Sequence, residues 1–359
     1  MRKITSFVAG ICAIGASVAF GTGKAAAFTD PTFEHVAYAT DSFMQHLDVY
    51  LPDSFCGPRP CVIYFFGGGW VVGSKDDVAP YVDTLLARGF AVASVDYEYS
   101  YQALFPAQIH DVKGAIRFLR AHAEEYQLDP NRFAVFGDSA GAYLATLVGT
   151  AGDVPELEGT TGGNLKYSSR VQAAADFYGP IDLWSYGEVY PSCSSSVSQL
   201  FGVCFGDLLA NQDNPDWADE VALVNSAIPQ NYITLDDPPF QVVHGDSDSI
   251  VPPSQGVDLY NALVAGGVPA TLYLLPGIGH EDVPMSAYET VFDNFAALLM
   301  PPVRPADLTC DGQVNIDDLT LIITGWGVCV STGSGCQGDV NHDGQVNIDD
   351  LTAVILDWG

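Results

Sequence analysis

The residues that could carry chemistry begin with a serine between two glycines. The segment Gly137–Gly141, of sequence GDSAG, follows the apolar run Phe133–Phe136 and leads into a helical pattern. A tight turn between a strand and a helix exposes the serine hydroxyl at the N-terminus of the helix, where a nucleophile is useful. Glycines are needed because the turn is crowded and its central residue is strained. The motif alone is only moderately specific, because glycine and serine are also common in ordinary turns.

A serine nucleophile needs a base within hydrogen-bond reach that takes its proton during attack. Three histidines follow Ser139 in the chain. His342 falls inside a C-terminal repeat, and His244 ends an apolar strand, where it would point into the sheet or its rim. His280 lies in a glycine-rich loop just after the predicted strand 270–275, where an imidazole can be mobile and well aimed. We therefore predict that His280 is the base.

The base in turn needs an acid that orients it. The predicted strand 240–244 is followed by a loop that contains two aspartates, Asp246 and Asp248. Asp248 is our candidate acid, and Asp246, a residue type that caps turns, is the alternative. The three candidates then follow one another in the order serine, aspartate, histidine, which is one of the orders that such triads take.

A glycine run could supply the remaining requirement, N–H donors for the negative charge that develops on a substrate oxygen. Residues 66–70, of sequence FGGGW, lie at the end of the predicted strand 62–66. Glycines let backbone N–H groups approach a ligand with no side chain in the way. Three glycines alone are more often a flexible loop. A position after a buried strand and about 70 residues before Ser139 favours an oxyanion-binding loop.

The elements that must position these residues alternate between strands and helices. Short apolar runs predict strands, and longer stretches with helical periodicity predict the helices between them. This alternation predicts an α/β fold, a mostly parallel sheet covered by helices on both faces, with its site at the carboxyl ends of the strands. The predicted strands are residues 45–51, 62–66, 91–96, 133–136, 173–177, 240–244 and 270–275, and the predicted helices include residues 78–88, 108–125, 140–149, 254–265 and 287–299.

Two copies of one motif end the chain. The sequence GQVNIDDLT at residues 312–320 recurs without change at residues 344–352, and each copy is followed by a Trp-Gly pair. Chance does not explain a match of this length, so we infer an internal duplication. A proline-rich linker, residues 301–306, separates the repeats from the preceding domain, residues 28–300.

Each repeat spaces oxygen-bearing side chains as a calcium-binding loop does. Calcium takes oxygen ligands from loop positions 1, 3, 5, 7 and 12, and a glycine at position 6 permits the sharp turn. An acidic turn without metal is the alternative, but two matched copies favour two Ca²⁺ sites. The candidate ligands are Asp307, Thr309, Asp311, Gln313 and Asp318 in the first loop, and Asp339, Asn341, Asp343, Gln345 and Asp350 in the second, with Asn315 and Asn347 at position 9.

Residues 1–27 are typical of a secretory signal peptide. Two basic residues precede an apolar run rich in small residues, and Ala25-Ala26-Ala27 supplies a cleavage pattern. The run is short for a membrane anchor, and no later segment is long and apolar enough to cross a membrane. We therefore expect a secreted or cell-surface protein without a membrane span.

The cysteines fit an exported protein, in which disulfides are favoured over metal sites. Sequence alone does not determine how they pair. The pairs that the spacing favours are Cys56–Cys61, Cys193–Cys204 and Cys329–Cys336, with Cys310 left over.

The charge of the chain excludes two classes of partner. The formal net charge is −31, from 13 basic and 44 acidic residues. Such a protein repels phosphate groups, so nucleic acid and anionic membranes are poor partners.

The serine turn, the glycine run and the loops of Asp248 and His280 together resemble the α/β-hydrolase esterases of the hormone-sensitive-lipase type. Among these, the resemblance is to the extracellular bacterial branch that includes feruloyl and acetyl esterases. The resemblance covers roughly residues 33–300 and also rests on residues 105–111, 163–172 and 237–240. It implies that Ser139 is the nucleophile, Asp248 the orienting acid and His280 the base. It also implies an oxyanion hole and no catalytic metal or other cofactor. The oxyanion hole would consist of the backbone N–H groups of Gly68, Gly69 and Ala140.

Two departures from the family pattern stand near the glycine loop. Phe66 occupies a position where the family usually has histidine, so a hydrogen bond that braces the loop is expected to be missing. Glu98 stands where an arginine usually follows Tyr97. We expect both to affect the rigidity of the loop and the reaction rate while leaving the triad intact.

The C-terminal repeats resemble a type I dockerin in a divergent form. Position 12 of each loop is aspartate, at Asp318 and Asp350, where a calcium loop of this kind normally has glutamate. The resemblance implies a small all-α domain, residues 307–359, and a cohesin-like protein as its partner. Attachment to a cell surface and a purely stabilising role are the alternatives.

The leading hypothesis is a secreted serine carboxylic-ester hydrolase that acts through an acyl-enzyme on acetyl or feruloyl esters of plant or algal polysaccharides. The substrate class is inferred only by association, because a fold does not set a substrate. A general short-chain carboxylesterase or a polyester hydrolase is the alternative enzyme, and a catalytically silent binding module held on a scaffold is the alternative of another class. Specificity is expected to lie in residues 184–219, whose aromatic side chains could stack on a phenolic group or a sugar, or else form plain core.

Overall fold

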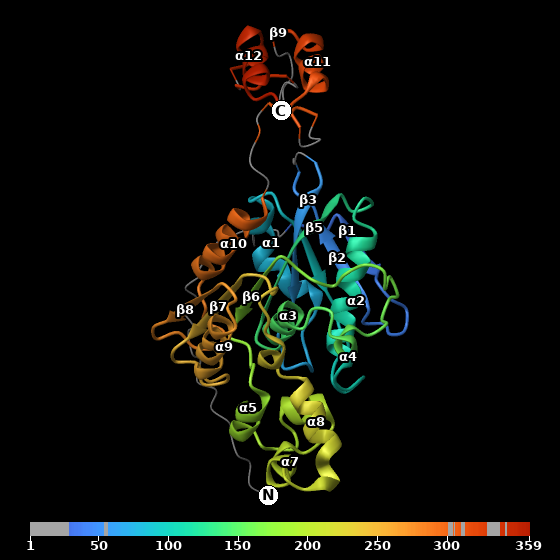
Figure 1. The fold of residues 1–359 in the computed structure, drawn as a ribbon, viewed down its shortest axis with the longest axis vertical. Helices are drawn as coiled ribbons and strands as arrows, with labels where there is room; N and C mark the ends of the chain where they lie inside the picture. The colour runs from blue at the N-terminus through green and yellow to red at the C-terminus, as the bar shows by residue number, and fades with distance from the viewer. Residues whose placement is uncertain are drawn as a thin grey trace, which may run out of the picture.

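The computed structural model describes residues 29–53, 57–300, 304, 306–309, 313–328, 338–341 and 343–359. Its main element is an eight-stranded sheet with the strand order β1-β2-β4-β3-β5-β6-β7-β8 (Figure 1). The pairings of β2 with β1 and β4 are antiparallel, and all pairings from β4 to β8 are parallel. The strands are β1 Phe33–Ala37, β2 His46–Tyr50, β3 Arg59–Phe65, β4 Ala91–Val95, β5 Leu128–Asp138, β6 Ala173–Phe177, β7 Phe240–Gly245 and β8 Ala270–Leu275.

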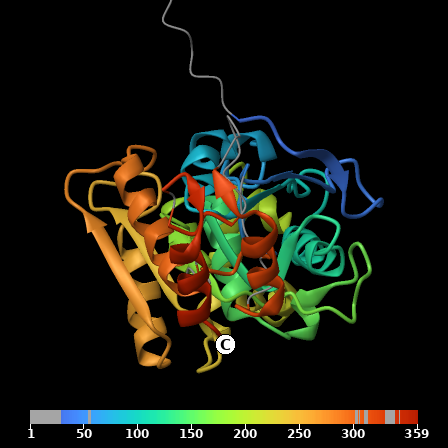
Figure 2. The same ribbon diagram turned by 90° about the horizontal axis from the view of Figure 1, so that it is seen from above.

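Helices cover this sheet, as the alternating sequence pattern predicts (Figures 1 and 2). Helix α2 packs against α3, and α1 packs against α10. The helices that connect the strands are α1 Ala79–Leu86, α2 Ala107–Ala121, α3 Ala140–Thr150, α4 Pro155–Glu158, α9 Ser254–Ala265 and α10 Met285–Leu299. Within the described part of the chain, no helix combines the length and the apolar character that a membrane crossing requires.

Every predicted strand is present, but β1 was not predicted. Its sequence, FEHVA, is short and only partly buried, and its pairing with β2 is irregular between Phe33 and Val36. His35, inside this irregularity, has a positive φ of 53°. An edge strand of this kind lacks the continuous apolar run that identifies a buried parallel strand.

The central strands and one helix explain why the serine turn is held firmly. Strands β3, β4, β6 and β7 are buried along their whole length, as expected for parallel strands that are covered on both faces. Every residue of α3 is also buried, because a helix that is apolar all round belongs in the core. The turn between β5 and α3 therefore joins two core elements.

A helical segment is inserted between β6 and β7. It contains α5 Leu183–Val189, α6 Ser196–Phe201, α7 Phe205–Ala210 and α8 Ala218–Ser226, together with two short 3₁₀ turns. Figure 1 shows α5, α7 and α8 beyond one end of the sheet. Helices α5 and α7 pack directly on each other, because a Cβ atom on Gly187 would collide with the ring of Phe205.

The structure confirms one predicted disulfide and corrects another. Cys193 and Cys204 are bonded. Cys61 is a free and fully buried thiol within β3, so the proposed pairing with Cys56 is wrong. Burial raises the pKa of this thiol, which keeps it protonated. Cys56 and the three C-terminal cysteines, Cys310, Cys329 and Cys336, lie outside the described residues.

The duplicated sequence forms two equivalent helices, α11 Ile316–Thr324 and α12 Ile348–Leu356. Each begins with the same capping box, formed by Asn315 and Asp318 in one copy and by Asn347 and Asp350 in the other. The helices share a small apolar core that includes Ile322 and Val354. The expectation of an all-α unit needs a correction, because two short strands, β9 Gly327–Val328 and β10 Gln345–Val346, pair antiparallel.

One buried acid makes the stability of the fold depend on pH. Burial raises the pKa of Asp111 to about 7, although Gln45 and the N–H of Glu98 donate hydrogen bonds to its carboxylate. In an unfolded chain this pKa is about 4. The folded state therefore binds the proton more tightly. The contribution of this group to stability is complete below about pH 4 and is lost as the pH rises through about 7.

The free energy of unfolding of the wild type should fall between about pH 5 and pH 8 as Asp111 loses its proton. In Asp111→Asn this fall should be smaller, by about 1 kcal/mol or more. Urea denaturation at both pH values measures the difference. Glu125→Gln, which changes an exposed acid in the turn after α2, should keep the wild-type dependence. Equal losses in wild type and Asp111→Asn would contradict the prediction.

Candidate active site

Ser139 stands at the junction of β5 and α3 in a strained backbone conformation, with φ 51° and ψ −119°. Its N–H donates a hydrogen bond to the carbonyl of Phe177 at 2.9 Å. The two glycines of the motif are required by close packing. A Cβ atom on Gly141 would collide with the carbonyl of Phe65, and one on Gly137 would collide with the backbone of Gly141. The turn thus presents the serine hydroxyl in the way that the motif predicts.

The structure brings the three predicted triad residues together. His280, in the loop after β8, has Nε2 at 3.0 Å from Oγ of Ser139. Its other ring nitrogen, Nδ1, lies 2.7 Å from Oδ2 of Asp248, in the loop after β7. When Nδ1–H donates to the carboxylate, Nε2 is left with a lone pair that can accept the serine proton. The ring of Tyr178 contacts His280 edge-on, with 4.7 Å between ring centroids.

The surroundings of the Asp248 carboxylate favour its ionised form. Burial by itself would raise its pKa, but hydrogen bonds from His244, His280 and the N–H groups of Val251 and Ile250 outweigh burial and hold the pKa below its usual range. The two N–H groups donate to Oδ1 at 2.9 and 2.8 Å and so leave Oδ2 to the imidazole. An ionised, oriented carboxylate stabilises the imidazolium that forms when the base takes a proton.

His244 is a contact of this site that the sequence reasoning missed. It is fully buried, and its Nε2 lies 3.3 Å from Oδ2 of Asp248 and 3.0 Å from the carbonyl of Val251. Its Nδ1 has no hydrogen-bond partner among the described residues. The His244 imidazole therefore packs against the Asp248 carboxylate. The four-residue spacing between the histidine and the aspartate was the available signal.

Asp246, the alternative acid, has a different position. It is exposed, and its Oδ1 accepts hydrogen bonds from the N–H of Gly277 at 2.6 Å and from Ser247 at 3.0 Å. These bonds tie the loop after β7 to the loop after β8, which carries His280. Asp246 therefore joins the two loops, while Asp248 contacts the imidazole.

The glycine loop lies beside the nucleophile. A Cβ atom on Gly67 would lie 3.3 Å from Cβ of Ser139. Gly68 and Gly69 have positive φ values of 93° and 61°, and a Cβ atom on Gly68 would collide with the carbonyl of Val72. The position of Gly68 therefore requires glycine. The loop therefore lies next to Ser139 and to Ala140, the first residue of α3, and the N–H groups of the loop and of Ala140 remain our candidate donors to a substrate oxygen.

Aromatic contacts brace the glycine loop in place of the expected histidine. The Phe66 ring is buried and stacks on Tyr97, with 4.2 Å between centroids and 10° between planes. The Tyr97 hydroxyl donates to the carbonyl of Phe66 at 2.7 Å. Glu98, the second departure, is held through its backbone, because its carbonyl accepts from Gln108. Phe66 and Glu98 thus have contacts of their own with neighbouring residues, and their effect on the rigidity of the loop and on the reaction rate stays a prediction.

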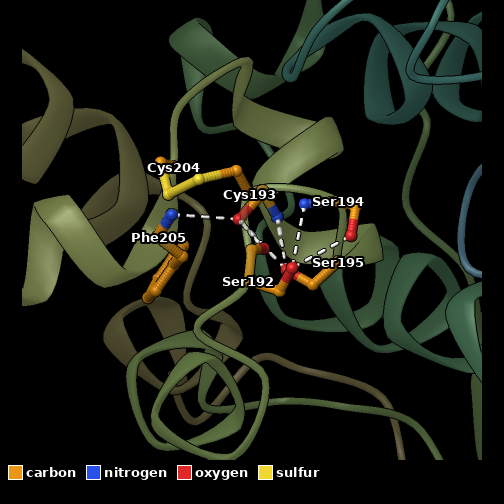
Figure 3. Close-up of a disulfide and its surroundings, with 7 residues drawn as sticks. Ser192, Cys193, Ser194, Ser195, Cys204 and Phe205 are labelled. Carbon is orange, nitrogen blue, oxygen red and sulfur yellow. Dashed lines mark hydrogen bonds between the residues drawn. A yellow bond between two sulfur atoms is a disulfide. The ribbon is translucent and has the colours of Figure 1, made fainter.

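The helical segment inserted between β6 and β7 lies next to the glycine loop. A Cβ atom on Gly69 would lie 3.1 Å from Cβ of Ser196, at the start of α6. The disulfide and a network of serine hydroxyls hold this loop, and Figure 3 shows the disulfide beside Ser192 and Ser195. At the other side, the Tyr190 hydroxyl donates to the carbonyl of Ser249 at 3.2 Å. The insertion thus borders both the glycine loop and the loop of the acid.

The candidate calcium ligands of the second repeat lie near one another. The N–H of Asp343 donates to Oδ1 of Asp339 at 3.0 Å and to Oδ1 of Asn341 at 2.9 Å. Asp350 is buried and accepts from the N–H of Asn341 at 3.2 Å. In the first repeat, the N–H of Thr309 donates to buried Asp318 at 2.8 Å. Asp311 lies outside the described residues.

The described residues of these loops offer the oxygen ligands of a calcium site but do not form a close acidic cluster. The donor set of side-chain carboxylates and amides is the oxygen chemistry that calcium takes. Among the described residues, however, the only group of three or more histidine, cysteine or acidic side chains whose ligand atoms lie within 4.8 Å of one another is Cys193, Cys204 and Asp207. The two cysteines of that group form the disulfide.

Comparison with known proteins identifies the family to which residues 47–263 belong. The family model BD-FAE matches residues 47–263, which is more than half of the chain. The esterase LipC of Mycobacterium tuberculosis is 32% identical over 249 residues, which cover 68% of this chain and 58% of that protein. The esterase LipQ of the same organism is 32% identical over 238 residues, 65% of this chain and 53% of that protein. The chain spans about half the length of the curated relatives that it matches.

Solved structures of esterases also resemble this chain. A bifunctional GH43-CE protein of Bacteroides eggerthii is 34% identical, with a TM-score of 0.65, and the match covers 74% of this chain and 38% of that one. A truncated carbohydrate esterase from gut microbiota is 29% identical, also with a TM-score of 0.65, over 75% of this chain and 97% of that one. The chain belongs to the BD-FAE family of α/β-hydrolases.

Proposed function

We propose that the protein is a serine carboxylic-ester hydrolase in which Ser139 is the nucleophile, His280 the base and Asp248 the orienting acid. The observation that carries the proposal is the pair of contacts made by one imidazole, at 3.0 Å to the serine hydroxyl and 2.7 Å to the carboxylate. The esterase names of the mycobacterial relatives support it.

The reaction follows from this geometry. Nε2 of His280 accepts the proton of Ser139 as Oγ attacks the ester carbonyl, and N–H groups of Gly68, Gly69 and Ala140 stabilise the oxyanion. The tetrahedral intermediate collapses when its carbon–oxygen bond breaks and the imidazolium gives its proton to the departing alcohol. Water then gives a proton to His280 and attacks the acyl-enzyme, which releases the acid and restores the serine hydroxyl.

We propose acetyl or feruloyl esters of plant or algal polysaccharides as the substrates. The printed names of two structural neighbours support this class, because one is a carbohydrate esterase and the other a bifunctional GH43-CE protein. The insertion contributes the aromatic side chains Tyr186, Tyr190 and Trp217. Tyr186 and Tyr190 contact each other at 5.1 Å between centroids, and all three pack on the core. A general short-chain carboxylesterase or a polyester hydrolase remains the alternative.

Initial rates on methyl ferulate and p-nitrophenyl acetate test the substrate class. We expect Ser139→Ala to serve as the blank for both. A clear preference for ferulate would place a phenolic acyl group against the insertion. Activity confined to acetate would instead support a deacetylase or a general short-chain esterase and contradict the feruloyl assignment.

A silent scaffold-held binding module is the competing function of another class. The close contact between His280 and Ser139 argues against it, because such a contact activates a serine. A fluorophosphonate probe for serine hydrolases distinguishes the two. Labelling that disappears in Ser139→Ala supports the hydrolase, and absence of labelling in the wild type supports the silent module.

We also propose that the enzyme is secreted and that residues 307–359 form a dockerin-like domain for a cohesin-like partner. The signal-like residues 1–27 support secretion. Exposed apolar side chains on the repeats support docking, because they recur at equivalent positions and such patches mark interaction sites. These pairs are Ile316 with Ile348, Ile323 with Ile355, and Trp326 with Trp358.

Calcium is expected to bind this domain and to stabilise it. Residues that would hold the ion in the second loop are Asp339, Asn341, Asp343, Gln345 and Asp350. Titration of CaCl₂ into the chelator-treated full chain should release or absorb heat and raise the far-ultraviolet helical signal. Asp339→Asn combined with Asp343→Asn should remove the site in the second loop. No heat and no gain in helicity in the wild type would contradict the calcium assignment.

A further inference from the structure

The loop after β4 carries an exposed aromatic side chain. Tyr101 is 67% exposed, and its ring stacks on that of Tyr99, with 5.2 Å between centroids and 28° between planes. A stacked pair is stiffer than a lone surface tyrosine, because the inner ring limits the rotamers of the outer one. The pair therefore presents a flat apolar surface to solvent.

The loop that carries this pair is hydrogen-bonded to the glycine loop and to the residues just after it. The Tyr99 hydroxyl donates a hydrogen bond to the carbonyl of Gly73, and the N–H of Ser100 donates to the carbonyl of Trp70 at 2.8 Å. The Tyr99 ring also contacts the edge of Phe66, with 6.3 Å between centroids. An uninterrupted series of ring contacts therefore runs from the residue before the oxyanion glycines to the exposed face of Tyr101.

Two further exposed apolar side chains lie on the segments beside this pair, one near the glycine loop and one next to the insertion. Val72 is 62% exposed and Leu104 is 48% exposed. Leu104 abuts Gly202 of the disulfide loop, and the N–H of Phe105 donates to the carbonyl of Leu200 at 2.9 Å. Tyr101 thus belongs to a loop that is bonded on one side to the glycine loop and on the other to the insertion that borders it.

We propose that Tyr101, backed by Tyr99, is a subsite that stacks on a neutral pyranose ring in the alcohol half of the ester. This proposal rests on the proposed polysaccharide-ester function. In this proposal, an ester whose carbonyl oxygen is held at the glycine loop has its alcohol half over the neighbouring loop that carries Tyr101. The C–H face of a sugar ring matches an uncharged aromatic plane. The net charge of −31 disfavours chains of uronic acids, so the proposed ring is a neutral one.

Kinetics on acetylated xylo-oligosaccharides and on p-nitrophenyl acetate test the subsite. We expect Tyr101→Ala to lower the ratio of kcat/KM on the oligosaccharide to that on p-nitrophenyl acetate by about 3- to 10-fold, mainly through KM. Tyr101→Phe keeps the ring and should keep most of the ratio. Phe43→Ala is the matched control, because Phe43 is a 75% exposed aromatic on the β1–β2 connection. It should leave the ratio unchanged.

Binding separates the subsite from the catalytic proposal. Calorimetry with xylohexaose should show about 3- to 10-fold weaker binding to Ser139→Ala/Tyr101→Ala than to Ser139→Ala, and hexagalacturonate should bind less well than xylohexaose. Equal ratios and equal affinities for Tyr101→Ala and Phe43→Ala would overturn the subsite while the esterase stands. Tyr101-dependent binding of xylohexaose without hydrolysis of any sugar ester would keep the subsite and overturn the polysaccharide-ester substrate.

Discussion

Replacement of Ser139 by alanine should lower kcat for ester hydrolysis by about 10⁵-fold or more. In the proposed mechanism the hydroxyl oxygen forms the acyl-enzyme, and the imidazole that would take its proton lies 3.0 Å away. Substrate binding should change little, because the side chain is small and the glycine loop is untouched. The expected signature is a collapse of kcat with KM nearly unchanged.

Steady-state rates on p-nitrophenyl acetate measure this effect, and fluorophosphonate labelling should vanish in parallel. Ser286→Ala, which changes an exposed serine on α10, should behave as wild type. Ser139→Gly should also be inactive and in addition more stable than the alanine variant, because glycine relieves the positive φ of 51°. Residual hydrolysis above about one hundredth of the wild-type rate would contradict the nucleophile assignment.

The second large effect should come from Asp248→Asn, with a loss of about 10³- to 10⁴-fold in kcat. An amide placed at this position can turn its N–H₂ towards Nδ1 of His280. The imidazole would then carry its proton on Nε2 and could not accept the serine proton. His244 contacts the same Oδ2 position at 3.3 Å, so the change also removes the negative charge from that contact.

Asp246→Asn is the matched control for this prediction, because Asp246 lies in the same loop and differs in its contacts. It should retain activity within about tenfold of the wild type, since its role is to bond the loop of His280 through Gly277. Rates across the pH range and thermal unfolding of both variants separate lost catalysis from lost stability. A larger loss for Asp246→Asn than for Asp248→Asn would show that the acid was assigned to the wrong aspartate.

The sequence alone determined the local structure around the nucleophile. Apolar runs bounded by glycine and proline identified β6 and β8 with their observed ends, Ala173–Phe177 and Ala270–Leu275. The same pattern located the serine turn and the loops that hold Asp248 and His280. These features are local, because the side chains that create each strand, turn or helix are neighbours in the chain. The order of the elements then determined a parallel sheet whose carboxyl ends hold the site.

The tertiary structure alone decided which distant side chains meet. Phe66 stacks on Tyr97, and His244 contacts Asp248 from inside β7. Ser196 of the insertion lies next to Gly69. The free thiol of Cys61 is another case, because this cysteine is buried within a central strand and forms no disulfide. Apart from the four-residue spacing between His244 and Asp248, neither periodicity nor motif spacing indicates these contacts. They depend on how the elements pack, and packing is set by the sum of many contacts between segments that are far apart in the chain.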